Sequence, residues 1–138
     1  MRLIEQVAQM LSVVLALNHA GKTAEASQEL DLCCRRTTGL PLGVVRNSSP
    51  ETLIEFLEQG GGLRYARAVM LAELLLQEME LDALSIQPEE RLRIQHLVHG
   101  LLASSIPFLS REEAAHFRPK LEILEENLRT SATVHIPS

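Results

Sequence analysis

Apolar residues recur with helical spacing along almost the whole chain, and the longest such stretch covers residues 63–84. This stretch holds neither proline nor glycine and is rich in Ala, Leu, Met, Glu and Gln, which lose little free energy on entering a helix. A surface helix needs only one apolar stripe, so we expect this helix at the centre of a bundle or in a subunit interface. Its apolar residues fill two faces: Tyr65, Val69, Ala72, Leu76 and Met79 on one, and Ala66, Met70, Leu74 and Leu81 on the other.

A second helix with a wide apolar face is predicted at residues 3–19. Gly21 follows it, and a further helix is predicted from Lys22 to Thr38, which Gly39 and Pro41 end. Only a few residues join the two helices, so they are expected to pack as an antiparallel hairpin. The wide face of the first helix consists of two stripes, one of Leu3, Val7, Met10, Val14 and Leu17 and the other of Ile4, Ala8, Leu11 and Leu15.

A loop is predicted at residues 40–48, followed by a short amphipathic helix. Ser49 is a suitable N-cap for this helix, and Pro50 suits its first position. Gly60, Gly61 and Gly62 follow and are expected to form a helix cap and a tight turn. They are not expected to bind phosphate, because the GxxxxGK[ST] arrangement is absent.

Two more helices complete the prediction. Pro88 begins a helix that runs to about Ser104 and packs back on residues 63–84 as a second hairpin. Ser110 and Glu113 form a capping box for the last helix, in which Pro119 produces either a kink or a restart. We therefore predict an all-α fold, a bundle of five to six helices over residues 1–130, with residues 131–138 as a flexible tail.

The first hairpin resembles the middle of a tetratricopeptide repeat, in which small residues let two helices approach closely. Residues 2–104 are also similar to a family of small, uncharacterised all-helical bacterial proteins, through the opening Arg-Leu-Ile-Glu-Gln helix, the glycine turn and the long Leu-rich helix. The resemblance implies a tetratricopeptide-like helical fold but transfers no functional site. The repeat resemblance rests on Ala16, Gly21, Glu25, Ala26 and Leu30.

Composition narrows the classes of partner. The 138 residues carry a formal charge of -5, which argues against nucleic acid, because binding a phosphate backbone requires excess Lys and Arg. The longest apolar run near the N-terminus, Met10–Leu17, is too short for a membrane span and is interrupted upstream by polar residues. We expect a cytoplasmic protein with no membrane partner.

Two adjacent cysteines, Cys33 and Cys34, lie on a predicted helix. Neighbouring helical side chains point about 100° apart, so no unstrained disulfide joins them, and no CxxC pattern exists. Cys33 is expected in the core. Cys34 is expected either there or as a reactive or intermolecular thiol.

His96 and His99 lie one turn apart and offer the strongest metal-ligand spacing in the chain. A helical di-metal site needs Glu-x-x-His pairs, whereas Arg93 precedes His96 by three residues. The alternative function is the binding of a small molecule or a metal ion in a pocket lined by His96, His99, Tyr65 and Arg64.

The long helix also carries the carboxylates Glu73, Glu78 and Glu80, which are expected at its solvated edge. A buried one is expected to pair with Arg64 or Arg67. No nucleophile, base and acid can be grouped from local sequence, so we predict no enzymatic activity and no cofactor.

The leading prediction is a protein–protein interaction module. Helices 3–19 and 63–84 carry more apolar surface than one hairpin covers, and a homodimer is the commonest way for a second copy to cover it; another protein or peptide is the alternative partner. The predicted interface residues are Leu3, Val7, Met10 and Val14, with Tyr65 and Val69 as a second choice.

Overall fold

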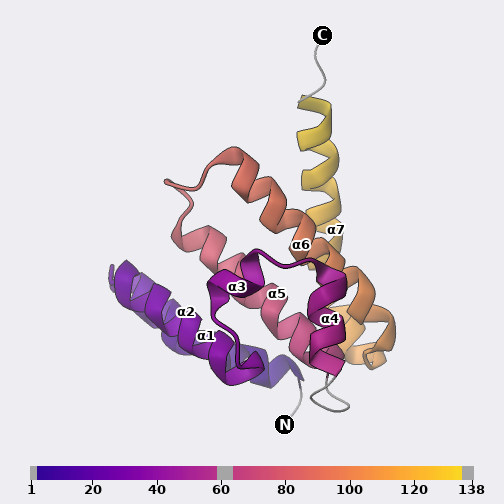
Figure 1. The fold of residues 1–138 in the computed structure, drawn as a ribbon, viewed down its shortest axis with the longest axis horizontal. Coiled ribbons are helices and arrows are strands. Elements are labelled where there is room, and N and C mark those ends of the chain that lie inside the picture. The colour runs from indigo at the N-terminus through magenta and orange to yellow at the C-terminus, as the bar shows by residue number, and fades with distance from the viewer. Residues whose placement is uncertain (1–2, 59–63, 135–138) are drawn as a thin grey trace.

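The computed structural model describes residues 3–58 and 64–134 (Figure 1). These residues are all-α, with no strand among them, and none of their helices is long and apolar enough to cross a membrane. The all-α class predicted from the sequence is confirmed. In chain order the elements are α1 (Leu3–His19), α2 (Thr23–Thr38), α3 (Leu42–Arg46), α4 (Pro50–Glu58), α5 (Arg64–Leu81), α6 (Pro88–Ser105), the 3-10 turn η1 (Ile106–Phe108) and α7 (Arg111–Val134).

Helix α5 lies at the centre, as its two apolar stripes predict. It packs against α1, α2, α4 and α6, so most of its circumference is covered (Figure 1). Half of its 18 residues are buried, including two carboxylates, Glu73 and Glu78. Removing apolar surface from water stabilises the folded state by about 25 cal/mol for each Å², and α5 buries more of this surface than a helix with a single apolar stripe.

The two predicted hairpins are both present, since α1 packs on α2 and α5 packs on α6. Gly21 closes the first hairpin with a φ of 76°, in the left-handed region that glycine adopts without a steric penalty. Gly39 ends α2 in the same way, with a φ of 79°, and its N–H bonds to the carbonyl of Arg35. The glycines at 60–62 lie outside the described residues.

Residues 40–48 are predicted to form a loop, but Leu42–Arg46 within them form the short helix α3. Pro41 precedes it, and the backbone N–H of Leu42 donates to the Asp31 carboxylate at 2.9 Å. An unpaired N–H of the first turn thus finds a partner on α2, eleven residues earlier in the chain. With α3 included, the described residues form seven α-helices rather than five or six.

Helix α7 begins at the predicted capping box. The N–H of Ser110 donates to Glu113 Oε1 at 3.1 Å, and the N–H of Glu113 donates to Ser110 Oγ at 3.2 Å. Pro119 lies inside α7 and does not break it, because both Pro119 and Ala115, whose carbonyl loses its partner, are exposed to water. The helix continues to Val134, into the segment predicted as a tail, and its C-terminal half extends beyond the other helices (Figure 1).

Candidate functional site

Four of the six predicted interface residues are buried in the core of the chain, and the other two are partly covered. Leu3, Val7, Val14 and Val69 are at most 6% exposed, and Met10 and Tyr65 are partly buried. The apolar stripe of α1 faces α2 and α5, so the surface that we assigned to a second copy belongs to the core of this chain. A dimer that left this core intact could not use these residues as its main contacts.

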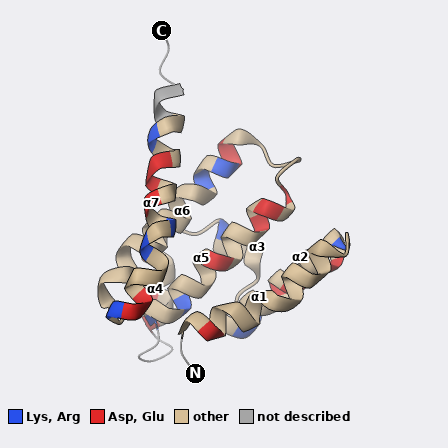
Figure 2. Cartoon of the chain, turned by 180° about the vertical axis from the view of Figure 1, so that it is seen from behind, with Lys and Arg blue, Asp and Glu red and all other residues tan. Residues whose placement is uncertain are grey.

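The opposite side of α1 faces solvent, and Glu5 is its last acidic or basic residue apart from His19. From Gln6 to Gly21 the chain contains no Asp, Glu, Lys or Arg, and Figure 2 shows α1 without a charged position after the acidic residue near its start. Val13 is 49% exposed and Leu15 is 38% exposed. We call this surface the outer face of α1; it consists of Ala8, Gln9, Ser12, Val13, Leu15 and Ala16, together with Ala20 directly after the helix, and the exposed Glu5 and His19 lie toward its two ends.

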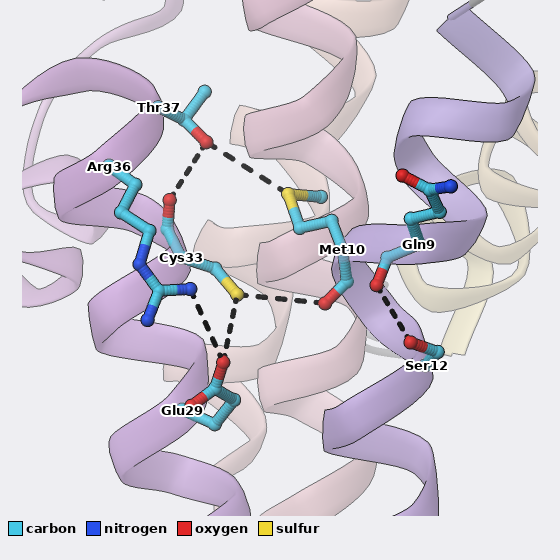
Figure 3. Close-up of polar contacts among 7 residues, drawn as sticks. All are labelled: Gln9, Met10, Ser12, Glu29, Cys33, Arg36 and Thr37. Atoms are coloured by element: carbon cyan, nitrogen blue, oxygen red, sulfur yellow. Dashed lines mark hydrogen bonds and ion pairs between the residues drawn. The ribbon is translucent and has the colours of Figure 1, made fainter.

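Polar contacts fix α1 on α2 and leave the outer face free of them, apart from one bond within α1 from Ser12 to the carbonyl of Gln9 (Figure 3). Cys33 Sγ lies 3.6 Å from the carbonyl oxygen of Met10, and Thr37 Oγ1 lies 3.9 Å from Met10 Sδ. On α2 itself, Arg36 and Glu29 form an ion pair at 3.5 Å. The two contacts to Met10 lie between α1 and α2 (Figure 3).

Both cysteines are buried, which excludes the accessible thiol considered for Cys34. Burial raises the pKa of the Cys34 thiol to about 11, and burial together with the nearby Glu29 raises the pKa of Cys33. At neutral pH both are therefore protonated, the form that neither attacks electrophiles nor binds metal.

The four residues of the predicted ligand pocket do not converge. Tyr65 stacks on Phe108 with ring centroids 4.3 Å apart, and Arg64 lies 4.6 Å over the Tyr65 ring and pairs with Glu58 at 2.9 Å. His99 instead lies about two turns before the end of α6, 4.0 Å from Glu125 of α7, and His96 is exposed. Among residues 3–58 and 64–134, no group of three or more His, Cys, Asp or Glu is placed to hold a metal ion.

Two of the carboxylates of α5, Glu73 and Glu78, are buried rather than at a solvated edge, and their partners differ from those predicted. Glu73 is 2% exposed and accepts a hydrogen bond from Lys120 of α7, with 2.5 Å between Oε1 and Nζ. Glu78 pairs with Arg46 of α3 at 2.9 Å. Arg64 and Arg67 are six or more residues from these acids along α5, whereas side chains within one helix meet at a spacing of three or four residues. The partners of Glu73 and Glu78 therefore come from other helices.

Burial is the largest influence on the Glu78 carboxyl and raises its pKa, although Arg46 acts in the opposite direction. Arg46 Nε also lies 3.8 Å from Glu90, and its carbonyl accepts a hydrogen bond from Arg93 at 2.6 Å. Glu78 Oε1 is buried and has no hydrogen-bond partner among the described residues. This network joins α3, α5 and α6 and serves their packing.

A pocket of about 360 Å³ opens between α5, α6 and α7. Glu73 and Lys120 line it, Arg91 of α6 borders it, and Ile123 of α7, 61% exposed, forms part of its apolar wall. We call it the α5–α7 pocket; its lining residues are Glu73, Leu76, Gln77, Met79, Glu80, Ala83, Arg91, Gln95, Lys120, Ile123, Leu124 and Asn127. Nothing in the local sequence signals it, because three helices meet there.

The resemblances of the sequence to a tetratricopeptide hairpin and to small helical bacterial proteins concern ancestry, which a helical fold alone does not establish. Among the surfaces of the described residues, we base the functional argument on the outer face of α1 and on the α5–α7 pocket. Comparison of the chain with family models, curated proteins and solved structures finds no match.

Proposed function

We propose that this protein is a non-enzymatic interaction module, a helical bundle with a tetratricopeptide-like first hairpin, that forms a homodimer through the outer face of α1. One observation carries the proposal: half the circumference of a 17-residue helix faces solvent without a charged side chain after Glu5. In a chain with 22% charged residues, a solvent-facing helix surface ordinarily contains several.

The residues of this face suit close contact with another helix. Ala8, Ser12, Ala16 and Ala20 are spaced four apart and form a low ridge, which allows two helix axes to approach to the short end of the usual 8–10 Å range. Val13 and Leu15 lie beside this ridge, and their exposed surface would leave water on association.

The charge distribution favours a second copy over an unrelated partner. Glu5 and His19 are the only titratable residues of α1 and lie near its opposite ends, equally far from Ser12. A two-fold axis at Ser12 would pair two uncharged faces in antiparallel orientation and bring Glu5 of one copy toward the His19 end of the other. A strongly charged partner would find no counterpart between these ends.

The test is the solution mass by light scattering over a concentration series reaching high micromolar protein. We expect the native chain to have twice the chain mass and the Ser12→Glu and Ala16→Glu variants to be monomeric, because each places a charge in the centre of the interface. Ser27→Glu is the matched control, since Ser27 is exposed on α2 and away from the outer face.

Circular dichroism and thermal unfolding show whether each variant is folded, which is expected because both positions are exposed. A native chain that stays monomeric throughout the series would overturn the dimer. A folded Ser12→Glu variant that keeps the native mass would remove the outer face of α1 from the interface.

A further inference from the structure

We infer that the α5–α7 pocket is a binding site for a small amphipathic carboxylate, a ligand with one anionic head and an aliphatic or aromatic body. This inference is independent of self-association, because the pocket lies between α5, α6 and α7 whereas the outer face belongs to α1. At about 360 Å³ its volume falls within the range of small-molecule pockets, about 300–1,000 Å³.

Two cations reach the pocket with unused hydrogen-bond donors. Lys120 Nζ donates to Glu73 and lies 5.9 Å from the ring centre of Phe117, which leaves two of its three N–H groups without a partner among the described residues. Arg91 uses one guanidinium nitrogen for the carbonyl of Ala83, at 3.3 Å. Its remaining N–H groups have no described partner either.

These cations come from different helices, Arg91 from α6 and Lys120 from α7, so an anion between them would receive charge-assisted hydrogen bonds from both. The amide side chains of Gln77, Gln95 and Asn127 line the same space and add donors. Lys120 and Arg91 thus offer charged donors that are still unused, whereas the buried carboxylate of Glu73 is already paired with Lys120, which favours an anionic head.

Glu73 does not exclude that head, because its charge is already paired. Its carboxylate is 2% exposed and bonded to Lys120, whereas the other carboxylate of the pocket, Glu80, is exposed to water. A lysine ammonium can bridge two carboxylates, since its three donors point in different directions. Glu73 therefore holds Lys120 in place and leaves its other donors for the ligand.

The apolar part of the pocket accounts for the body of the ligand. Leu76 and Met79 from α5 and Leu124 from α7 line it, and Ile123 presents a large apolar side chain that is 61% exposed. An aliphatic or aromatic body lying against Ile123 would remove that surface from water. A head with no body would leave this wall exposed.

The probes are octanoate, octylammonium and octanol, which share a chain and differ in the charge of the head. Each is titrated into the isotope-labelled 138-residue chain, octanoate and octylammonium below their micelle concentrations and octanol below its solubility limit, and is followed by amide chemical shifts. We expect octanoate to bind most tightly, with the side-chain amides of Gln77, Gln95 and Asn127 among the signals that move.

Arg91→Gln is expected to weaken octanoate binding about tenfold or more, the usual effect of losing a charged hydrogen-bond donor. Ile123→Glu is expected to abolish it by placing a carboxylate against the ligand, and its position is exposed, so the fold is retained. Arg118→Gln is the matched control, because Arg118 is exposed on the same helix as Lys120 and does not line the pocket.

Three results would overturn the inference. Octylammonium binding more tightly than octanoate would make Glu73 and Glu80 the recognition groups. Equal binding of all three probes would reduce the pocket to an apolar surface. Absence of any shift with octanoate would leave no ligand of this class.

Discussion

Pro50 of α4 occupies the position beside Gly100 of α6 where a β-carbon would have to lie. A β-carbon built on Gly100 meets Pro50 Cγ at 2.4 Å and Pro50 Cβ at 2.8 Å. Real β-carbons essentially never approach other atoms this closely, and a proline ring cannot rotate away. The absence of a side chain at residue 100 therefore sets how closely α4 packs on α6.

Gly100→Ala should destabilise the protein by about 1–3 kcal/mol, the usual cost of forcing an extra carbon into a packed contact. Gly43→Ala is the control, because its β-carbon would meet only Arg46 Nη2 at 3.7 Å, an ordinary contact. Both are helical positions where alanine is intrinsically favoured, so the difference isolates the clash. Equal midpoints in urea unfolding of the two variants would contradict the contact.

Asp31→Ala should lower the free energy of unfolding at neutral pH by about 1 kcal/mol, since the carboxylate bonds the Leu42 N–H and pairs with the exposed Arg35. The Arg35 hydrogen bond is the main cause of a lowered Asp31 pKa, so the native state releases this proton more readily than the unfolded state does. The contribution is present above the unfolded-state pKa and is lost as the pH falls through the native one.

Urea titrations of native protein and Asp31→Ala between pH 2 and 7 would measure this loss. A stability difference that stays constant over that range would mean that the charge of Asp31 does not matter.

Glu78 should show the opposite pH dependence. Burial raises its pKa, so the native state binds the proton more tightly than the unfolded state. Its contribution is fully present below the unfolded-state pKa and is lost as the pH rises through the native one. The stability of the native protein relative to Glu78→Gln should therefore decrease from acid to neutral pH in urea titrations. A relative stability that increases with pH would show that the Arg46 ion pair outweighs burial.

The two cysteines should resist alkylation in the native state, because both are buried and protonated at neutral pH. Iodoacetamide at pH 7.5 should label neither within the time that fully labels both in guanidinium chloride, as counted by intact mass. Rapid labelling of one thiol in the folded protein would show that the α1–α2 hairpin opens.

Periodicity predicted most helices of this fold because their start and stop signals are local. Pro50 and Pro88 begin helices, Ser110 and Glu113 cap one, and Gly39 ends one. The missed helix, α3, depends on a carboxylate eleven residues away, which no local rule detects. Spacing along the chain thus identifies helices whose ends are determined by their own residues.

The sites were harder to predict, because spacing reports which residues share a face and not what covers that face. Val7 and Val14 share one apolar stripe, as their spacing predicts, but this stripe packs on α2 and α5 of the same chain. Likewise, Glu73 is bonded to Lys120, forty-seven residues later, so its burial depends on tertiary packing. A surface formed by several helices can therefore be identified only from the three-dimensional structure.

The central place of α5 also affects how the chain can fold during synthesis. The hairpin of α1 and α2 is complete at Thr38, but the helix that covers its apolar side ends only at Leu81. At ordinary translation rates that interval lasts on the order of seconds. During it Leu3, Val7 and Val14 have no α5 to pack on, so a ribosome-bound nascent chain presents to chaperones an apolar surface that the finished protein never exposes.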